Sequence, residues 1–249
     1  AGGAVNRAIQ QLETFGDQPF LLAVGLHEPH IPWPAPERFY DLYRLDELRL
    51  PETRKRSGHP GGELRLDTTS FRKGNTPKET ERIYREATRG YLAATSFADA
   101  QIGRLLEKLK ELGMKDNTIV ILWSDHGYHL GEHGHWGKGT LFEESLRVPL
   151  IVAGPGMEGG KATQAIVELI DIFPTLCELT GLPPAPDLEG MSFVPVLTDP
   201  ALPGKPAAFS QIGAGPANCA TTARYRYVEH TDASVAEIAG KRDIPVQGR

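Results

Sequence analysis

The chain has 249 residues, 40% of them hydrophobic and 24% charged, which suits one large or two small domains with a buried core and excludes a disordered or fibrous protein. The net charge of −5, from 27 Lys and Arg against 32 Asp and Glu, gives no general attraction to nucleic acid. No apolar run approaches the roughly 18 residues of a membrane span, and two cysteines, Cys177 and Cys219, are too few for a disulfide framework or a thiolate zinc site.

The first part of the chain predicts a helix, a strand and a proline-rich loop. Apolar residues three to four positions apart predict a helix over residues 4–15. The continuous apolar run over residues 20–24 predicts a short strand covered on both faces. Prolines between positions 29 and 36 exclude regular structure from the loop that follows, and the polar residues 51–75 indicate a surface excursion.

The clearest helix start is at Thr76, which is followed by a proline and, at position 79, by a glutamate that can complete a capping box. One apolar stripe then continues to Gly113. Beyond it we expect strands over residues 118–123, 148–153 and 225–229, and a helix over 172–179 capped by Asp171. Strands that alternate with helices predict an α/β fold with a mostly parallel sheet.

Two of the predicted strands run into polar residues. His27 follows the first strand, and Asp125, His126 and then Lys138 follow the strand that ends at residue 123. Ligands bind outside the carboxyl ends of parallel strands, so we expect both loops to open onto one edge of the sheet. Asp125 and His126 offer a carboxylate oxygen and an imidazole to one metal ion. The alternative is that Asp125 caps the next turn and His126 packs.

Three nearby histidines, His129, His133 and His135, raise the question of a separate zinc site. Gly131 and Gly134 argue against a helical ligand pair, and the spacing does not match His-Glu-x-x-His. These histidines are otherwise packing or surface residues. Taken alone, Lys138 has the usual reading of an exposed lysine, although Gly137 and Gly139 beside it would let the backbone lie close to an anion. His27 taken alone is equally a core or loop histidine or a substrate contact.

Several stretches, in order and with matching spacing, resemble the sulfatase family, nearest to its iduronate-2-sulfatase and choline-sulfatase branches. They are residues 22–32 (LAVGLHEPHIP), 123–134 (WSDHGYHLGEHG), 136–138 (WGK), 142–151 (FEESLRVPLI) and 171–176 (DIFPTL). The resemblance covers about residues 1–200. It implies an alkaline-phosphatase-like α/β fold, with residues 1–200 as the middle and C-terminal portion of the catalytic domain and 201–249 as the start of a smaller subdomain.

The resemblance also implies an activity: hydrolysis of a small-molecule or saccharide sulfate monoester with a formylglycine nucleophile and a divalent metal, expected to be Ca²⁺. By resemblance, Asp125 and His126 match two metal ligands, although calcium prefers oxygen and a histidine ligand is atypical. Lys138 matches the lysine that contacts sulfate and the nucleophile. His27 matches the histidine that contacts the ester and assists the leaving oxygen. The family's members imply a periplasmic, secreted or lysosomal location.

Parts of the family's site are missing from these residues. The nucleophile motif, Cys-x-Pro-Ser-Arg or Cys-x-Ala-x-Arg, fits neither Cys177 nor Cys219, no serine fits its serine version, and the adjacent Asp-Asp pair is absent. We therefore expect a piece of a longer protein whose N-terminal part carries the formylglycine, and no turnover by this piece alone. Glu28, where relatives often carry lysine, disfavours a polyanionic substrate near His27.

Two other functions stay open at this point. One is a metal-dependent phosphatase or phosphodiesterase of the same superfamily, which typically uses two zinc ions and more His and Asp ligands; the Lys138 motif favours sulfate instead. The other is a binding protein that has lost its nucleophile and catalyses nothing.

Overall fold

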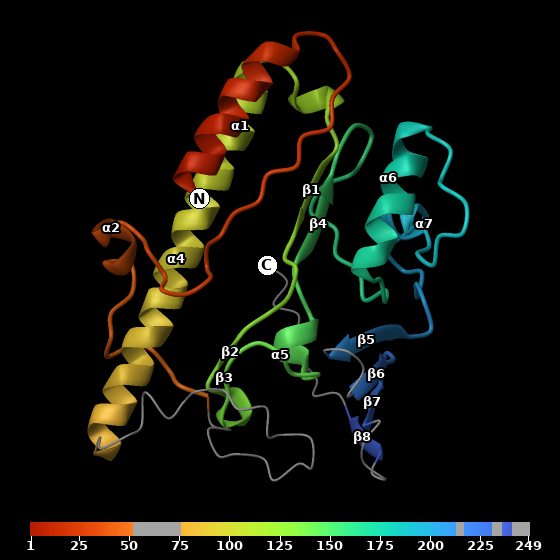
Figure 1. Ribbon diagram of the computed structural model, residues 1–249. Helices are drawn as coiled ribbons and strands as arrows, with labels where there is room; N and C mark the ends of the chain where they lie inside the picture. The colour runs from red at the N-terminus through yellow and green to blue at the C-terminus, as the bar shows by residue number, and fades with distance from the viewer. Residues whose placement is uncertain (52–75, 213–216, 231–235, 241–249) are drawn as a thin grey trace. The chain divides into compact units, whose positions relative to one another are not determined.

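The computed structural model (Figure 1) describes residues 1–51, 76–212, 217–230 and 236–240. These residues belong to two compact units. Among the described residues, the first unit takes 1–51, 76–119 and 129–137, and the second takes 120–128 and the residues from 138 onward. The excursion predicted over residues 51–75 lies, apart from Pro51, outside the described residues. The boundary expected at residue 200, between the catalytic domain and the smaller C-terminal subdomain, stays a prediction.

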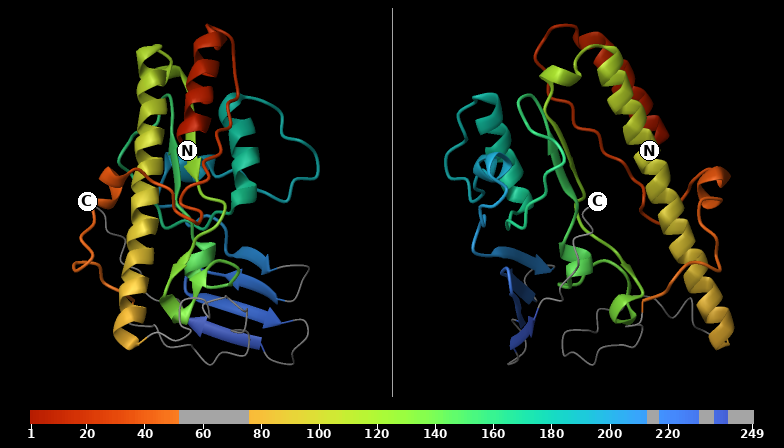
Figure 2. Two further views of the ribbon diagram at one scale, coloured as in Figure 1. Left: turned by 60° about the vertical axis from the view of Figure 1, so that its left-hand side comes forward. Right: turned by 180° about the vertical axis from the view of Figure 1, so that it is seen from behind.

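Two long helices organise the first unit. The predicted helices are confirmed as α1 (Gly2–Phe15) and α4 (Pro77–Glu111), which lie side by side, with α2 (Glu37–Tyr40) on α4 further along (Figure 2). Apolar side chains of α1, such as Val5 and Leu12, are buried, as is Ala94 of α4. Their apolar stripes explain the pairing, because burying them removes apolar surface from water.

The capping box predicted for α4 is present. The Thr76 hydroxyl accepts the Glu79 backbone N–H at 3.3 Å, and the Thr76 N–H donates to the Glu79 carboxylate at 2.7 Å. After α4 come η1 (Lys115–Asn117) and, in the same unit, the antiparallel pair β2 (His129–Leu130) and β3 (Trp136–Gly137) around η2 (Glu132–Gly134). No helix in the described ranges is long and apolar enough to cross a membrane.

The second unit is built on strands β1 (Val120–Trp123) and β4 (Leu150–Ala153), which pair antiparallel. Its helical parts are α5 (Glu143–Leu146), η3 (Leu169–Asp171), α6 (Ile172–Thr180) and α7 (Val194–Thr198). Ile172, Phe193 and Val196 form a core against which apolar residues of β1 and β4 pack. The predicted helix after Asp171 is thus confirmed, and Gly181 ends it in the left-handed conformation at φ 69°.

A four-stranded antiparallel sheet completes this unit. Its order is β5 (Ala208–Ile212), β6 (Ala217–Thr221), β7 (Tyr225–His230) and β8 (Ala236–Gly240). Of these strands only β7 was predicted. β6 mixes polar with small residues, and the large apolar residues of β5, Phe209 and Ile212, do not alternate as a strand pattern requires. Cys219 and Val228 of this sheet pack with Leu141.

The α/β class is confirmed, but the prediction of a mostly parallel sheet is wrong for the described residues. Every ladder between the strands named here is antiparallel. Residues 20–24 form no strand, and Leu21 is 84% exposed. The physical reason is that an apolar run indicates which residues favour burial, whereas strand direction depends on the neighbour that supplies the hydrogen bonds.

Candidate active site

Asp125 and His126 lie in a turn directly after β1. Ser124 Oγ donates to the His126 carbonyl oxygen at 2.8 Å, and the His126 N–H donates to Asp125 Oδ1 at 3.0 Å. Gly127 N–H donates to the Ser145 carbonyl of α5 at 2.8 Å. A Cβ at Gly127 would lie 2.0 Å from the carbonyl oxygen of residue 144, so only glycine permits this approach.

The imidazole of His126 is fixed on both sides. Its Nδ1 lies 2.9 Å from the Gly127 carbonyl oxygen and its Nε2 lies 2.7 Å from Lys138 Nζ. A carbonyl only accepts, so Nδ1 carries the proton and the Nε2 lone pair accepts from the lysine ammonium. Asp125 Oδ2 is 3.5 Å from the same Nε2. The structure therefore brings together three of the four predicted site residues, Asp125, His126 and Lys138.

The donor set fits a divalent cation in part. The Asp125 carboxylate lies next to His126 Nε2, which is the unprotonated imidazole nitrogen in this tautomer. Two ligands of one metal ion require such proximity. Asp125 is exposed, with 83% of its side chain accessible, so the ion would be reached from solvent. Within the described ranges, no group of three or more His, Cys, Asp or Glu side chains could hold a metal ion by itself.

His27 belongs to the first unit and is described there by itself. It is exposed, and its ring centroid lies 4.8 Å from that of His30. The His30 N–H donates to the His27 carbonyl at 2.9 Å, so the two residues share one tight turn. That His27 faces the same substrate as Lys138 stays a prediction.

The three histidines considered for zinc lie in the first unit around β2 and β3. The ring of His129 is 6.0 Å from that of His133 and 5.8 Å from that of His135. His129 and His135 are buried. The burial of His129 and His135 fits the packing interpretation for these two residues. Cys177 and Cys219 are buried and form no disulfide, which agrees with neither being a nucleophile.

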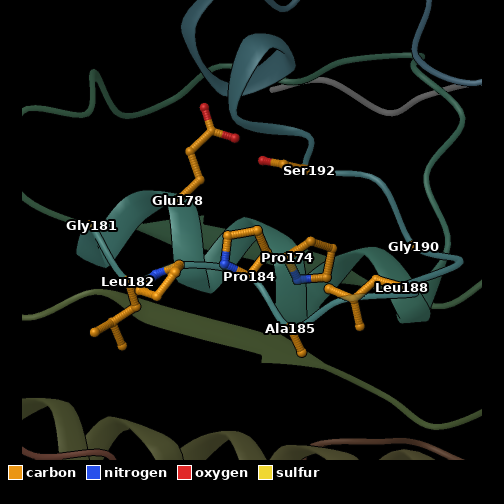
Figure 3. A pocket seen from close by; sticks show the side chains of 10 residues that line it. Pro174, Glu178, Gly181, Leu182, Pro184, Ala185, Leu188, Gly190 and Ser192 are labelled. Atoms are coloured by element: carbon orange, nitrogen blue, oxygen red, sulfur yellow. The ribbon is translucent and has the colours of Figure 1, made fainter.

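A surface pocket of about 760 Å³ lies elsewhere in the second unit, between α6 and residues 181–192 (Figure 3). Glu178 and Ser192 supply its polar side chains, and prolines and aliphatic residues such as Pro174 and Leu188 line the rest. None of the predicted site residues line it. A single carboxylate among apolar groups offers no arrangement for hydrolysis, so we assign it no role.

Ser124 and Gly127 hold the turn of Asp125 and His126 and were not predicted as site residues. A glycine immediately after two chemistry-bearing residues was the available signal, because such a glycine often marks close approach of the backbone. The contact with α5 that requires it is visible only in the structure.

Comparison with solved structures defines the fold. The structure of BT4656 in complex with its substrate D-glucosamine-2-N,6-O-disulfate superposes with a TM-score of 0.83 at 24% identity, covering 95% of this chain and 62% of that one. A phosphonate monoester hydrolase from Silicibacter pomeroyi follows with a TM-score of 0.78 at 23% identity, covering 95% and 52%. The fold is the alkaline-phosphatase-like α/β fold of these hydrolases.

Sequence comparison then identifies the family. The sulfatase family model matches residues 4–182, and the chain belongs to the sulfatase family. It is 36% identical over 181 residues to a sulfatase of Formosa agariphila, with 72% of this chain and 36% of the relative covered. It is 32% identical to human iduronate 2-sulfatase (84% and 48% covered) and 33% identical to the choline-sulfatase of Rhizobium meliloti (79% and 41%). The chain thus spans less than half the length of these relatives.

Proposed function

We propose that the protein containing this chain hydrolyses sulfate monoesters. The observation that carries the proposal is the cluster of Lys138, His126 and Asp125 after β1, in a chain that belongs to the sulfatase family. A cation beside two possible metal ligands would supply the positive charge that an anionic ester requires.

Charge stabilisation is the chemistry that this cluster supports. A sulfate monoester carries one negative charge, and cleavage places further negative charge on the departing oxygen. Lys138 is exposed, and its ammonium hydrogen-bonds to His126 Nε2, so it can turn from there to a sulfate oxygen. Asp125 and His126 would hold a divalent cation, expected to be Ca²⁺, which when bound polarises the sulfate oxygens.

His27 is proposed to contact the ester and to give a proton to the leaving oxygen. An imidazole is suited to this role because its ordinary pKa lies near neutrality. The formylglycine nucleophile is expected outside residues 1–249, since Cys177 and Cys219 are buried and neither lies in the family's motif.

The substrate class proposed is a small-molecule or saccharide sulfate ester. The names of the relatives point to both kinds, an iduronate sulfatase and a choline sulfatase, and the neighbour BT4656 was solved with a disulfated glucosamine. Glu28 follows His27 in the sequence, and a carboxylate at this position is proposed to favour a substrate with few charges over a polyanion.

The experiment is a substrate panel on the full-length protein: choline sulfate, D-glucosamine 6-O-sulfate and 4-nitrophenyl sulfate, with 4-nitrophenyl phosphate and a phosphonate monoester as comparison. We expect turnover of sulfates above phosphorus esters. Turnover of only the phosphorus esters would replace this proposal with the phosphatase alternative. Binding of sulfate esters without any turnover would support a non-catalytic homologue.

A further inference from the structure

The backbone of Trp33 has a conformation that its surroundings must hold in place. Its φ of 62° lies in the left-handed region, which bulky residues rarely adopt. Such outliers persist only where neighbouring contacts determine them, and they are frequent near functional sites. Trp33 lies within the proline-rich loop that follows His27.

A hydrogen bond from α2 holds the Trp33 backbone, and α4 in turn holds that residue of α2. Tyr40 Oη donates to the Trp33 carbonyl at 2.8 Å. The Tyr40 carbonyl in turn accepts from Nε and Nη2 of Arg89 at 3.0 and 2.9 Å. The loop is therefore tied to α4 through two consecutive polar contacts.

The Trp33 indole packs against α4 at a position where α4 has no side chain. Trp33 joins the cluster of Tyr84, Ala87 and Trp136 and lies directly over Gly90, which is buried. A Cβ at Gly90 would be 3.1 Å from the indole Cε3, inside the roughly 3.5–4.0 Å of an optimal carbon contact. On the same helix, a Cβ at Gly103 would meet nothing within 4 Å.

Two short backbone contacts connect Trp33 to His27. The Trp33 N–H donates to the His30 carbonyl at 3.3 Å, and the His30 N–H donates to the His27 carbonyl at 2.9 Å. The turn over residues 30–33 directly follows the turn over residues 27–30. A displacement of the Trp33 indole should therefore also displace the turn that carries His27. All of these residues belong to the first unit.

We propose that Gly90 and Trp33 form a positioning pair that sets the place of His27 for proton transfer to the leaving oxygen. The inference rests on the proposed function and on the role proposed there for His27. Gly90 acts through Trp33 and touches no substrate.

The test compares Gly90→Ala with Gly103→Ala in the full-length protein. An aryl sulfate has a good leaving group that needs no proton, whereas an alkyl sulfate depends on one. We measure kcat/KM on 4-nitrophenyl sulfate and on choline sulfate or D-glucosamine 6-O-sulfate, whichever the panel shows to be turned over faster. Gly90→Ala should lower the alkyl-to-aryl ratio about tenfold, because small misplacements of catalytic groups are costly. Gly103→Ala should leave the ratio unchanged.

A second substitution should rescue the first. In Gly90→Ala with Trp33→Phe, the smaller ring leaves room for the alanine methyl, so the ratio should recover most of the loss. This non-additivity is the signature of two residues in contact. Tyr40→Phe, which removes the hydrogen bond to the Trp33 carbonyl without adding bulk, should lower the ratio in the same direction and serves if Gly90→Ala does not fold.

His27→Ala separates the possible failures. If His27→Ala lowers the ratio but Gly90→Ala and Tyr40→Phe do not, the positioning pair is wrong while the proposed function stands. If His27→Ala leaves the ratio unchanged, the proton-transfer role of His27 is wrong and the positioning proposal falls with it. If the full-length protein turns over no sulfate ester, the proposed function itself fails.

Discussion

At the scale of single residues, His126 shows how one side chain can serve two partners. Its Nδ1 faces the Gly127 carbonyl, which directs the Nε2 lone pair toward Lys138 at 2.7 Å. A cation bound at Nε2 and the lysine cannot share that lone pair, so metal binding would free the ammonium for an anion. The residue types were evident from the sequence, and the tautomer came from the fold.

Lys138→Ala should reduce kcat by about 10² to 10³ with little change in KM, since a charge that acts on the developing anion contributes mainly in the transition state. Steady-state kinetics on the full-length protein measure this effect. Lys161→Ala is the matched control, because Lys161 is 44% exposed and pairs with an exposed glutamate. Equal rates for wild type and Lys138→Ala would make Lys138 a surface lysine.

Asp125→Ala should lower both bound metal and turnover, because the carboxylate is one of two ligand groups on this turn. Metal content by elemental analysis after dialysis is the direct measurement. Asp116→Ala, at an exposed aspartate in η1, should retain the metal. Normal metal content in Asp125→Ala would remove this residue from the ligand set.

At the scale of elements, a buried ion cluster joins the segments around α6. Lys205 Nζ lies 2.6 Å from both Glu168 and Asp171 carboxylates, and the Lys205 and Asp171 side chains are 11% and 1% exposed. Asp171 also accepts the backbone N–H of Glu168 and that of Met191, each at 2.8 Å. The sequence predicted Asp171 as a helix cap, but its side chain makes no cap hydrogen bond to α6 and connects loops instead.

Lys205→Met should destabilise the protein by about 3–5 kcal/mol, because it leaves the buried Asp171 carboxylate and the partly buried Glu168 carboxylate without their cation. Urea unfolding of the full-length protein measures the change. Lys161→Met, in an exposed pair, should cost about 1 kcal/mol or less. Similar small losses for both variants would show that the Lys205 cluster does not stabilise the fold.

The same cluster predicts a pH dependence. Burial works to lower the pKa of Lys205, but its hydrogen bonds and proximity to Asp171 and Glu168 outweigh burial and raise the pKa above its ordinary value of 10.5. When the pKa of a lysine is higher in the folded than in the unfolded protein, its charge stabilises the fold. This stabilisation is fully present at pH values below the pKa of the unfolded state and is lost as the pH rises through the pKa of the folded state. Wild type should therefore lose its advantage over Lys205→Met only above about pH 10.5; loss already near pH 8 would contradict the cluster's charge state.

At the scale of the whole molecule, the chain carries residues that are proposed for part of the family's site. It contains Asp125, His126 and Lys138 but no cysteine in the family's nucleophile motif, and it spans less than half the length of its curated relatives. Trp123 and Ile151, at the paired strands β1 and β4, are 46% and 57% exposed. Large apolar side chains on strands are usually covered in a complete domain.

The 249-residue chain expressed alone should therefore show no sulfatase turnover, while the full-length protein is active. The panel of sulfate esters measures both, with circular dichroism to show that the short chain has its helices. Turnover by residues 1–249 alone would mean that the nucleophile lies among them, and would overturn the assignment of a formylglycine elsewhere.

The sequence by itself determined the features that depend on neighbours along the chain. The helix from Pro77 to Glu111 followed from its capping box and apolar period, and the residues of the β1 turn followed from their chemistry. Local hydrogen bonds and side-chain periodicity involve residues a few positions apart, so they can be predicted from a single sequence.

Only the tertiary structure decided which distant residues meet. It paired β1 antiparallel with β4 where a parallel sheet was expected, left residues 20–24 without a strand, and set Lys138 on His126 and Trp33 on Gly90. Each of these depends on partners far away in sequence, whose contacts balance burial, hydrogen bonding and steric fit together. The local sequence around one partner therefore does not predict which distant residue it will contact.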